Sequence, residues 1–332
     1  MQPRYPDRQQ ILEMAAGFQT ACVVGAAAEL DAWTALADQP LEAEEAARRL
    51  GADARATAML LDAVAALGLL DKEDGRYQVP AELRPWLVST SPQSVLPMMW
   101  HRMNILRAWA RLAGVVKSGQ PAPCQASIRG AEADRAAFIA AMHTVSGPVA
   151  DDLVRRLMPL DFTHLLDVGG ALGTWTLAFL RAAPGATATI FDLPDAIEQA
   201  RARLARDPLA DRVQLVAGDF YADPLPAGAD FAWVSAIAHQ HSRQHNRALF
   251  GKVYAALCGG GRIGIRDIVM EPSRTRPVEG AMFAINMLVN TQTGGTFTFD
   301  EFADDLRAAG FAEPELRIKS EDMSSVVMAR KP

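Results

Sequence analysis

Cysteine is scarce in this chain of 332 residues, which contains only Cys22, Cys124 and Cys258. They are odd in number, far apart and without a C-x-x-C pair, which excludes a disulfide scaffold and a thiolate metal site and indicates a reducing compartment. The first ten residues, MQPRYPDRQQ, do not lead from a basic segment into an apolar one, so we expect no secretory signal. The sequence therefore predicts a cytoplasmic protein.

Long uncharged hydrophobic runs are also missing. The closest candidate, residues 11–30, contains Glu13, Gln19 and Glu29, and we expect these residues to exclude a membrane-spanning helix. Half of all residues are nevertheless hydrophobic and 22% are charged, which is enough apolar material for a folded core. At roughly 150 residues per domain, the length predicts two domains.

The N-terminal third has little positive charge, since residues 1–100 contain 8 Lys and Arg against 14 Asp and Glu. The pattern predicts helices over 9–30, 41–50 and 54–67, then a hairpin about the turn Asp74–Gly75. Helix, turn, helix and hairpin follow one another as in a winged helix. Binding to a phosphate backbone requires a face rich in Lys and Arg, so the acidic balance argues against DNA as a partner.

Residues 101–160 are predicted to be helices that bridge two domains, which gives boundaries of 1–100, 101–160 and 161–332. Within them, residues 136–157 predict a helix that is interrupted at Gly147–Pro148, because proline breaks a helix interior.

From residue 163 onward, short apolar runs alternate with amphipathic stretches, which predicts an α/β fold with a mostly parallel sheet covered on both faces. The predicted strands are THLLDV, TATIFDL, VQLVAG, FAWVSAI and RIGIRDIVM, with an antiparallel pair near 315–329. The predicted helices are 174–183, 195–205, 243–257 and 299–309.

A glycine-rich turn, DVGGALG (167–173), directly follows the first of these strands. A dinucleotide fingerprint needs glycine at its first, third and sixth positions, and neither Gly169 nor Gly170 starts such a register, so the pattern does not support NAD. Glycines at 169 and 173 let the backbone approach a ligand closely. The carboxylate of Asp167 suits a cationic amine better than a pyrophosphate.

Carboxylates also lie at the ends of the next two strands. Asp192, in FDLP, follows Gly169 by 23 residues, the place from which a carboxylate bonds ribose hydroxyls in such folds. Asp219 and Phe220, in GDFY, combine an acceptor for the adenine amino group with a ring that stacks on the base. Each carboxylate alone is as well explained as an ordinary strand-end residue, but the ordered set favours a nucleoside cofactor.

Together these segments resemble the class I S-adenosylmethionine-dependent methyltransferases, and the whole chain resembles the bacterial and plant small-molecule O-methyltransferases with an N-terminal winged-helix dimerisation domain. The similarity covers the winged helix, the bridging helices, DVGG, FDLP, GDFY and the block GGTFTFDEF. It implies a Rossmann-like methyltransferase domain, a homodimer formed through the N-terminal domain, and S-adenosylmethionine as the cofactor. It also implies a small, hydroxylated, aromatic acceptor, and neither nucleic acid nor a membrane as a partner.

The resemblance assigns the cofactor site to these strand ends. Asp167, Gly169, Gly170 and Gly173 would hold the methionine part, Asp192 and Leu193 the ribose, and Asp219 and Phe220 the adenine. Ala171 departs from the family, which usually has a third glycine there, but a methyl group is small and we expect the turn to survive.

The fourth strand runs into AHQHS (238–242), at the edge of the sheet where such folds bind ligands. O-methylation of a phenol requires a base, and the resemblance places it at His239, with Asp267 as the acid that orients the imidazole. Gln240 and His241 replace the family's usual Asp-Trp, and Phe297 stands where a second Glu is common. A C- or N-methyltransferase therefore stays open, as does a winged-helix regulator that binds the cofactor without turnover.

His239, His241 and His245 form an H-x-H-x3-H run that, with Asp267, resembles a metal site. Ser242 is a good helix N-cap, which would place His245 on the first helical turn, while His239 and His241 would point apart in extended chain. We therefore expect no metal.

The acceptor pocket is expected between the bridging helices and the segment AMFAINMLVNTQTGG (281–295). The candidate residues are Met142, His143, Phe283, Asn286, Met287 and Asn290. Core packing explains Met142 and Met287 equally well. Asn286 and Asn290 need hydrogen-bonding partners if they are buried, and would suit a polar group on a ligand.

Overall fold

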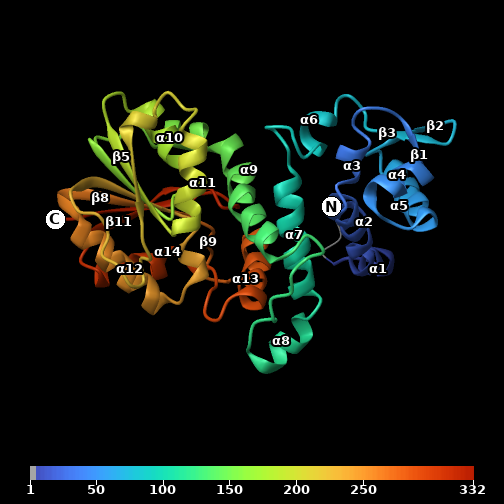
Figure 1. The fold of residues 1–332 in the computed structure, drawn as a ribbon. Helices are drawn as coiled ribbons and strands as arrows, with labels where there is room; N and C mark the ends of the chain where they lie inside the picture. The colour runs from blue at the N-terminus through green and yellow to red at the C-terminus, as the bar shows by residue number, and fades with distance from the viewer. Residues whose placement is uncertain (1–4) are drawn as a thin grey trace. The chain divides into compact units, whose positions relative to one another are not determined.

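Residues 5–332 are described in the computed structural model of the protein (Figure 1). The chain divides into two units, the first comprising the chain up to Arg107 together with Gln125–Thr144, the second Ala108–Cys124 together with Val145–Pro332. The predicted bridging segment 101–160 is therefore divided between the two units.

Unit 1 consists of short helices and a three-stranded sheet of order β1-β3-β2. Its elements are α1 (Arg8–Ala16), α2 (Phe18–Glu29), α3 (Ala32–Ala35), β1 (Leu41–Glu42), α4 (Ala43–Leu50), α5 (Ala54–Ala66), β2 (Asp71–Glu73), β3 (Arg76–Gln78), α6 (Arg84–Leu87) and most of α7 (Leu96–Trp109). Local chemistry sets these bounds: left-handed Gly51 ends α4, and the Asp53 side chain caps α5 by accepting from the Ala56 N–H. The helix pair and hairpin predicted from the sequence are confirmed.

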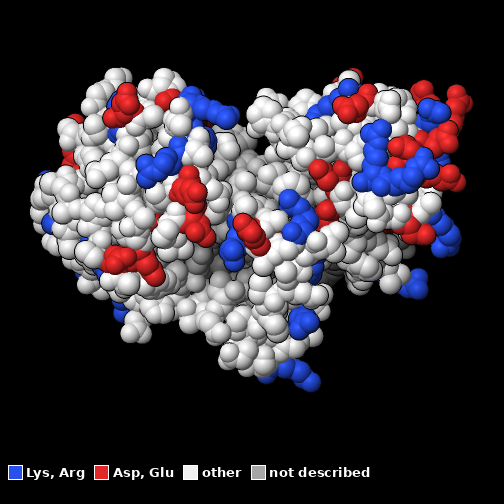
Figure 2. Space-filling view, in the orientation of Figure 1, with Lys and Arg blue, Asp and Glu red and all other residues white. Residues whose placement is uncertain are grey.

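Charged side chains on this helix pair and hairpin form ion pairs with one another. Arg48 pairs with Glu45, and Lys72 with Asp62 at 2.5 Å. Figure 2 shows acidic and basic side chains interspersed over this part of unit 1, on the face in view. Bases that already have acidic partners are poorly placed to bind phosphates.

Helices α1 and α2 carry exposed apolar surface. The segment Arg8–Glu29 is long and apolar enough to cross a membrane by length and composition, since its most apolar window of 18 residues has a mean hydropathy of 1.5. The exclusion expected from Glu13, Gln19 and Glu29 is therefore wrong, because a window of 18 residues holds too few charges to lower its hydropathy. Four large side chains there are at least half exposed: Ile11, Leu12, Met14 and Phe18. Apolar surface of this kind needs a cover, whether of protein or of lipid.

Unit 2 is built on a mixed seven-stranded sheet of order β11-β12-β8-β7-β4-β5-β6. Its strands are β4 (His164–Val168), β5 (Thr187–Asp192), β6 (Val213–Ala217), β7 (Ala229–Ser235), β8 (Leu257–Asp267), β11 (Ala312–Ile318) and β12 (Ser325–Arg330). Strands β4 to β8 are parallel, and β12 and β11 are added in antiparallel pairing. The predicted strands and the late antiparallel pair are confirmed.

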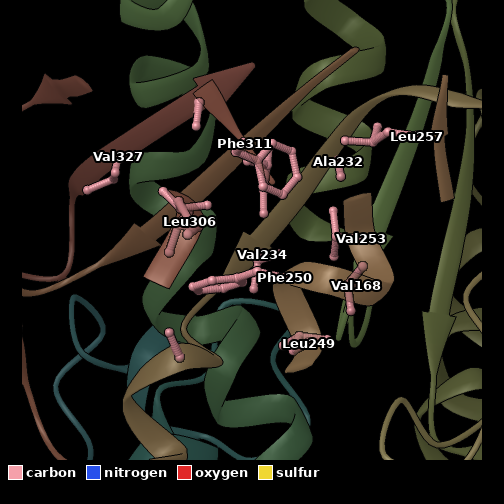
Figure 3. Packing of buried hydrophobic residues seen from close by; sticks show 14 of the residues in the cluster. Val168, Ala232, Val234, Leu249, Phe250, Val253, Leu257, Leu306, Phe311 and Val327 are labelled. Carbon is pink, nitrogen blue, oxygen red and sulfur yellow. The ribbon is translucent and has the colours of Figure 1, made fainter. Parts of the chain in front are cut away.

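Helices cover both faces of this sheet. One face packs on α10 (Thr174–Ala182), α11 (Pro194–Leu204) and the end of α9 (Ala131–Leu157). The other packs on α12 (Arg243–Ala256) and α14 (Phe299–Ala308), where Phe250 and Leu306 meet Val234 and Val327 (Figure 3). Since the central strands are buried on both sides, their sequences are continuous hydrophobic runs rather than alternating ones.

Helix α9 runs without interruption from Ala131 to Leu157, with Pro148 inside it. The predicted interruption at Gly147–Pro148 is therefore wrong. Proline removes one backbone hydrogen bond, but Leu153, Val154 and Leu157 after it are buried in the core, and that packing outweighs the local preference.

The remaining elements of unit 2 are short, apart from one helix. They are α8 (Leu112–Ser118), η1 (Ala210–Arg212), η2 (Ala238–Gln240), β9 (Val269–Met270), α13 (Val278–Asn290) and β10 (Phe297–Thr298). The short helix η2 follows β7, and α13 follows β9.

Candidate active site

The glycine turn after β4 has a backbone that side chains rarely tolerate. Gly169 and Gly173 have φ angles of +71° and +73°, and a Cβ at either would lie 2.5 or 2.8 Å from an isoleucine side chain. Ala171 has a φ of +46° in the same turn, and its N–H donates to Asp192 Oδ2 at 2.8 Å. The turn thus survives alanine at the third glycine position, as expected.

Asp167 lies buried beneath this turn, with 1% of its surface exposed. The Thr176 hydroxyl donates to Oδ2 at 2.5 Å, whereas Oδ1 has no partner among the described residues. Burial raises the pKa of Asp167 to about 7, and the nearby charge of Asp192 raises it further while the Thr176 bond opposes the shift. A buried acceptor atom without a donor fits the ammonium group of a ligand.

Asp192 is held at the end of β5 by two backbone amides. Its Oδ2 accepts from Ala171 and its Oδ1 from Leu193, at 2.8 and 2.7 Å. Burial raises the pKa of Asp192, and both hydrogen bonds oppose that shift. Each carboxylate oxygen retains a lone pair, so the group can accept from a pair of hydroxyls without moving. Leu193 beside it is 54% exposed and offers apolar surface.

The loop after β6 is curled by its own carboxylates. The Asp219 N–H donates to Asp223 Oδ2 at 2.8 Å, and Asp219 Oδ1 accepts from the Tyr221 N–H at 2.8 Å. The Phe220 ring lies 5.0 Å from that of Tyr221 and 5.6 Å from that of His241. Three aromatic rings therefore gather beside Asp219.

His239 and Asp267 form a buried pair at the ends of β7 and β8. Nδ1 of His239 is 2.9 and 3.0 Å from the two carboxylate oxygens. The carboxylate also accepts the N–H groups of His239 and Ile268, at 3.1 and 2.8 Å. Because an ionised carboxylate only accepts, Nδ1 carries the proton in this pair, and the neutral tautomer that this bond favours has its lone pair on Nε2. The ring of Phe283, from α13, meets the imidazole edge-on at 4.8 Å.

Two glycines that the sequence analysis did not assign to the site hold the backbone of His239. The Gly295 N–H donates to the His239 carbonyl at 2.9 Å, and a Cβ at Gly294 would lie 2.6 Å from that same oxygen. The available signal was a glycine pair three residues ahead of the Thr298 capping box. Phe297 packs on Phe302 with ring centroids 5.7 Å apart, so no second acid occupies that position.

The other two histidines of the run have separate partners. His241 Nδ1 bonds the Tyr221 hydroxyl, and burial, with His239 and His245 nearby, lowers the pKa of His241 to about 4. His245 lies in the first turn of α12, which Ser242 caps as predicted. Within residues 5–332, no three His, Cys, Asp or Glu side chains are grouped to hold a metal.

The asparagines proposed for the acceptor pocket find partners within the protein. Asn286 Oδ1 accepts from the Trp109 indole and from Asn290 Nδ2, both at 3.0 Å. Met287 is buried, 6% exposed. Met142 and His143 belong to unit 1 and the α13 residues to unit 2, so the pocket that they are predicted to share stays a prediction.

Comparison with known families decides what this arrangement belongs to. The profile of the O-methyltransferase domain matches residues 109–312, and that of the O-methyltransferase dimerisation domain matches residues 12–83. The chain belongs to the O-methyltransferase family. The match over residues 12–83 includes α2 and part of α1, and exposed apolar surface of this kind is typical of protein interfaces.

Several curated relatives of this family align over nearly the whole chain. The 3-hydroxy-5-methyl-1-naphthoate 3-O-methyltransferase of Streptomyces sahachiroi is 31% identical over 97% of this chain and 94% of its own. The tetracenomycin polyketide synthesis 8-O-methyl transferase TcmO of Streptomyces glaucescens is 30% identical over 97% and 96%. The N,N-dimethyltransferase OxyT of Streptomyces rimosus is 27% identical over 91% and 90%.

Solved structures of relatives contain the cofactor or its product. Human N-acetylserotonin methyltransferase in complex with SAM has a TM-score of 0.81 and 25% identity, covering 100% of this chain and 99% of that one. PigF with SAH has a TM-score of 0.87 and 26% identity, covering 98% and 100%. The protein is an S-adenosylmethionine-dependent methyltransferase of small molecules, with an α/β methyltransferase domain and an N-terminal dimerisation domain. The unpartnered Oδ1 of Asp167 and the glycine turn above it fit this cofactor.

Proposed function

We propose that the protein methylates a phenolic hydroxyl of a small aromatic metabolite, with His239 as the general base. The observation that carries the proposal is the buried pair of His239 and Asp267, which leaves Nε2 as the free base. Two relatives at least 30% identical to this chain are named for O-methylation, which supports oxygen as the methylated atom.

The proposed base has a clear task. A phenol with a pKa near 10 is ionised in about one molecule in 10³ at pH 7, and a positioned base raises the rate by about 10²–10⁴. S-adenosylmethionine supplies a methyl group that is already activated on a sulfonium. Nε2 of His239 accepts the hydroxyl proton, while Asp267 holds the ring through Nδ1 and stabilises the imidazolium. Phe283 lies against the imidazole and keeps water from it.

The same proposal places the cofactor along the carboxyl ends of β4, β5 and β6. The residues assigned are Asp167, Gly169, Gly170 and Gly173 for the methionine part, Asp192 and Leu193 for the ribose, and Asp219 and Phe220 for the adenine. The unpartnered Oδ1 of Asp167 supports the first group, and the fixed carboxylate of Asp192 supports the second.

The proposal also covers the acceptor pocket and the assembly of the protein. We assign Phe283, with Met142, His143, Asn286, Met287 and Asn290, to the acceptor. We also propose a cytoplasmic homodimer joined through residues 1–100, with residues 101–160 as a bridge and 161–332 as the catalytic domain. The ion pairs of the winged helix support a role without nucleic acid, and the dimerisation profile one without a membrane.

Methylation of nitrogen is the second candidate. Phe297, rather than an acid, occupies the position of the family's second orienting Glu and packs in the core, and one relative is named as an N,N-dimethyltransferase. An amine acceptor that is already uncharged needs less help from a base, so His239 would then contribute little to the rate.

Replacement of His239 separates the two candidates. For O-methylation, His239→Ala should lower kcat by about 10²–10⁴ at pH 7, with partial recovery at high pH, where a phenol ionises by itself. Asp267→Asn should lower kcat by a smaller factor, since the base His239 remains. Turnover is measured with labelled S-adenosylmethionine on a panel of phenols and arylamines, with binding of S-adenosylhomocysteine as the control. A His239→Ala enzyme within threefold of the wild type on its best acceptor would contradict the assignment.

A further inference from the structure

Lys252, on α12, donates all of its N–H groups to one loop. Its Nζ lies 2.6 Å from the carbonyl oxygen of Phe220, 3.1 Å from that of Tyr221 and 2.9 Å from that of Asp223. An ammonium group has three donors, so this set is complete. A partly exposed lysine usually bonds water. Here three carbonyls of one loop point at the same cation, which requires the loop to adopt one specific conformation.

Local hydrogen bonds within the loop turn its carbonyls toward Lys252. Asp219 and Asp223 bond each other through backbone and carboxylate, which curls residues 219–223 and turns several carbonyls to one side. Carbonyl dipoles that point together repel one another, and a cation between them removes the repulsion. A second tether runs from the Tyr221 hydroxyl to His241, just ahead of the same helix.

We propose that Lys252 is a positioning residue that holds the loop of Asp219 and Phe220 in the conformation that binds the adenine of S-adenosylmethionine. The inference rests on the proposed adenine site. The hydrogen bonds that Lys252 makes to the loop go to backbone carbonyls, so it contributes by removing the entropic cost of ordering Asp219 and Phe220 when the cofactor binds. Because the reacting methyl group belongs to another part of the cofactor, the effect falls on affinity and not on the chemical step.

Lys331 provides a matched control. Its Nζ also bonds carbonyls, those of Tyr254 and Leu257 at 2.7 and 2.6 Å, but these belong to the C-terminal end of α12 itself and not to the loop of the proposed site. Lys331→Met removes the same kind of charge-assisted bond from the same helix. A purely structural role for Lys252 predicts that both variants behave alike.

The test is calorimetric binding of S-adenosylhomocysteine and of adenosine, hydrogen exchange of residues 218–223 without ligand, and steady-state kinetics. Lys252→Met should raise the Kd of both ligands by about tenfold and the KM for S-adenosylmethionine similarly. It should speed exchange in the loop and leave kcat at saturating cofactor within twofold. Lys331→Met should leave the Kd values and loop exchange unchanged. If Lys252→Met does not fold, Lys252→Arg is used, with a smaller rise in Kd expected.

Two other outcomes overturn the proposal, and they differ from a failure of the site itself. If Lys252→Met speeds exchange in the loop but leaves the Kd of both ligands unchanged, the conformation that Lys252 holds is not the one that binds the adenine half of the cofactor. Equal losses in the two lysine variants would mean that the role is structural. The site is tested separately by Asp219→Ala and Phe220→Ala: if both bind adenosine normally, the adenine assignment is wrong, and if they lose affinity while Lys252→Met does not, only the clamp is wrong.

Discussion

At the scale of single residues, the proposed contact of the unpaired Asp167 oxygen with the cofactor ammonium predicts that cofactor binding depends on pH. Burial raises the pKa of this carboxyl to about 7, whereas a bound ammonium favours the ionised form. Binding below pH 7 must therefore release a proton. We expect the affinity for S-adenosylhomocysteine to fall about fivefold to tenfold between pH 8 and pH 6. Calorimetry in two buffers of different ionisation enthalpy measures both the affinity and the proton released.

Asp167→Asn serves as the control for this prediction, since it should bind more weakly at pH 8 and lose the pH dependence. His241, with a pKa of about 4, does not titrate in that range. The effect of pH on folding stability has the opposite direction. In the unfolded chain the carboxyl of Asp167 has its ordinary pKa of 3.8 and therefore loses its proton before the folded chain does. Asp167 thus lowers the free energy of unfolding as the pH rises from about 4 to 7. Equal affinity at pH 6 and pH 8 would contradict a contact between Asp167 and the ammonium.

At the scale of elements, the connection between α13 and β10 packs against the backbone of His239, the proposed base. A Cβ at Gly294 would lie 2.6 Å from the His239 carbonyl oxygen and 3.1 Å from the Gln240 carbonyl carbon, whereas one at Gly295 would meet nothing within 4 Å. Gly294→Ala should displace His239, costing about 1–3 kcal/mol in strain and at least about tenfold in kcat. Its neighbour supplies the control, because Gly295→Ala should retain full activity. Kinetics and thermal unfolding of both variants test this prediction. Equal activity of the two variants would contradict the role of Gly294 in positioning His239.

Elements of strong periodicity were predictable from the sequence, and contacts between distant segments were not. Helix α12 was predicted within one residue at its end, because Ser242 is a cap and the apolar period is clear. That Asp167, Asp192 and Asp219 lie at or just after the ends of β4, β5 and β6 could be predicted because strand ends have fixed places in a parallel sheet. The bonds of Lys252 to the loop of residues 220–223 and the contact of Gly294 with His239 join segments that are distant in the sequence. No local sequence pattern predicts contacts of this kind. Pro148 shows the reverse case, in which packing outweighed a valid local rule.

At the scale of the whole molecule, the apolar face of α1 and α2 needs a cover, and the dimerisation profile favours a second copy of this chain. Burying a large apolar side chain contributes about 1.5–3 kcal/mol. A variant with both Met14→Glu and Phe18→Glu should therefore raise the dimer Kd by at least about 10²-fold. Both side chains are more than half exposed in one chain, so the monomer should still fold.

Sedimentation of the wild type and of two double variants tests this interface. Met14→Leu with Phe18→Leu preserves the apolar character and should remain dimeric, which separates loss of hydrophobic contact from loss of shape. Flotation with phospholipid vesicles tests the other cover, because a segment of this length and hydropathy is also able to enter a bilayer. A dimer that excludes these helices leaves the face exposed and should bind vesicles, whereas a dimer that buries them should not. A glutamate variant that stays dimeric, together with a wild type that floats with vesicles, would assign the helices to lipid and overturn the dimer interface proposed here.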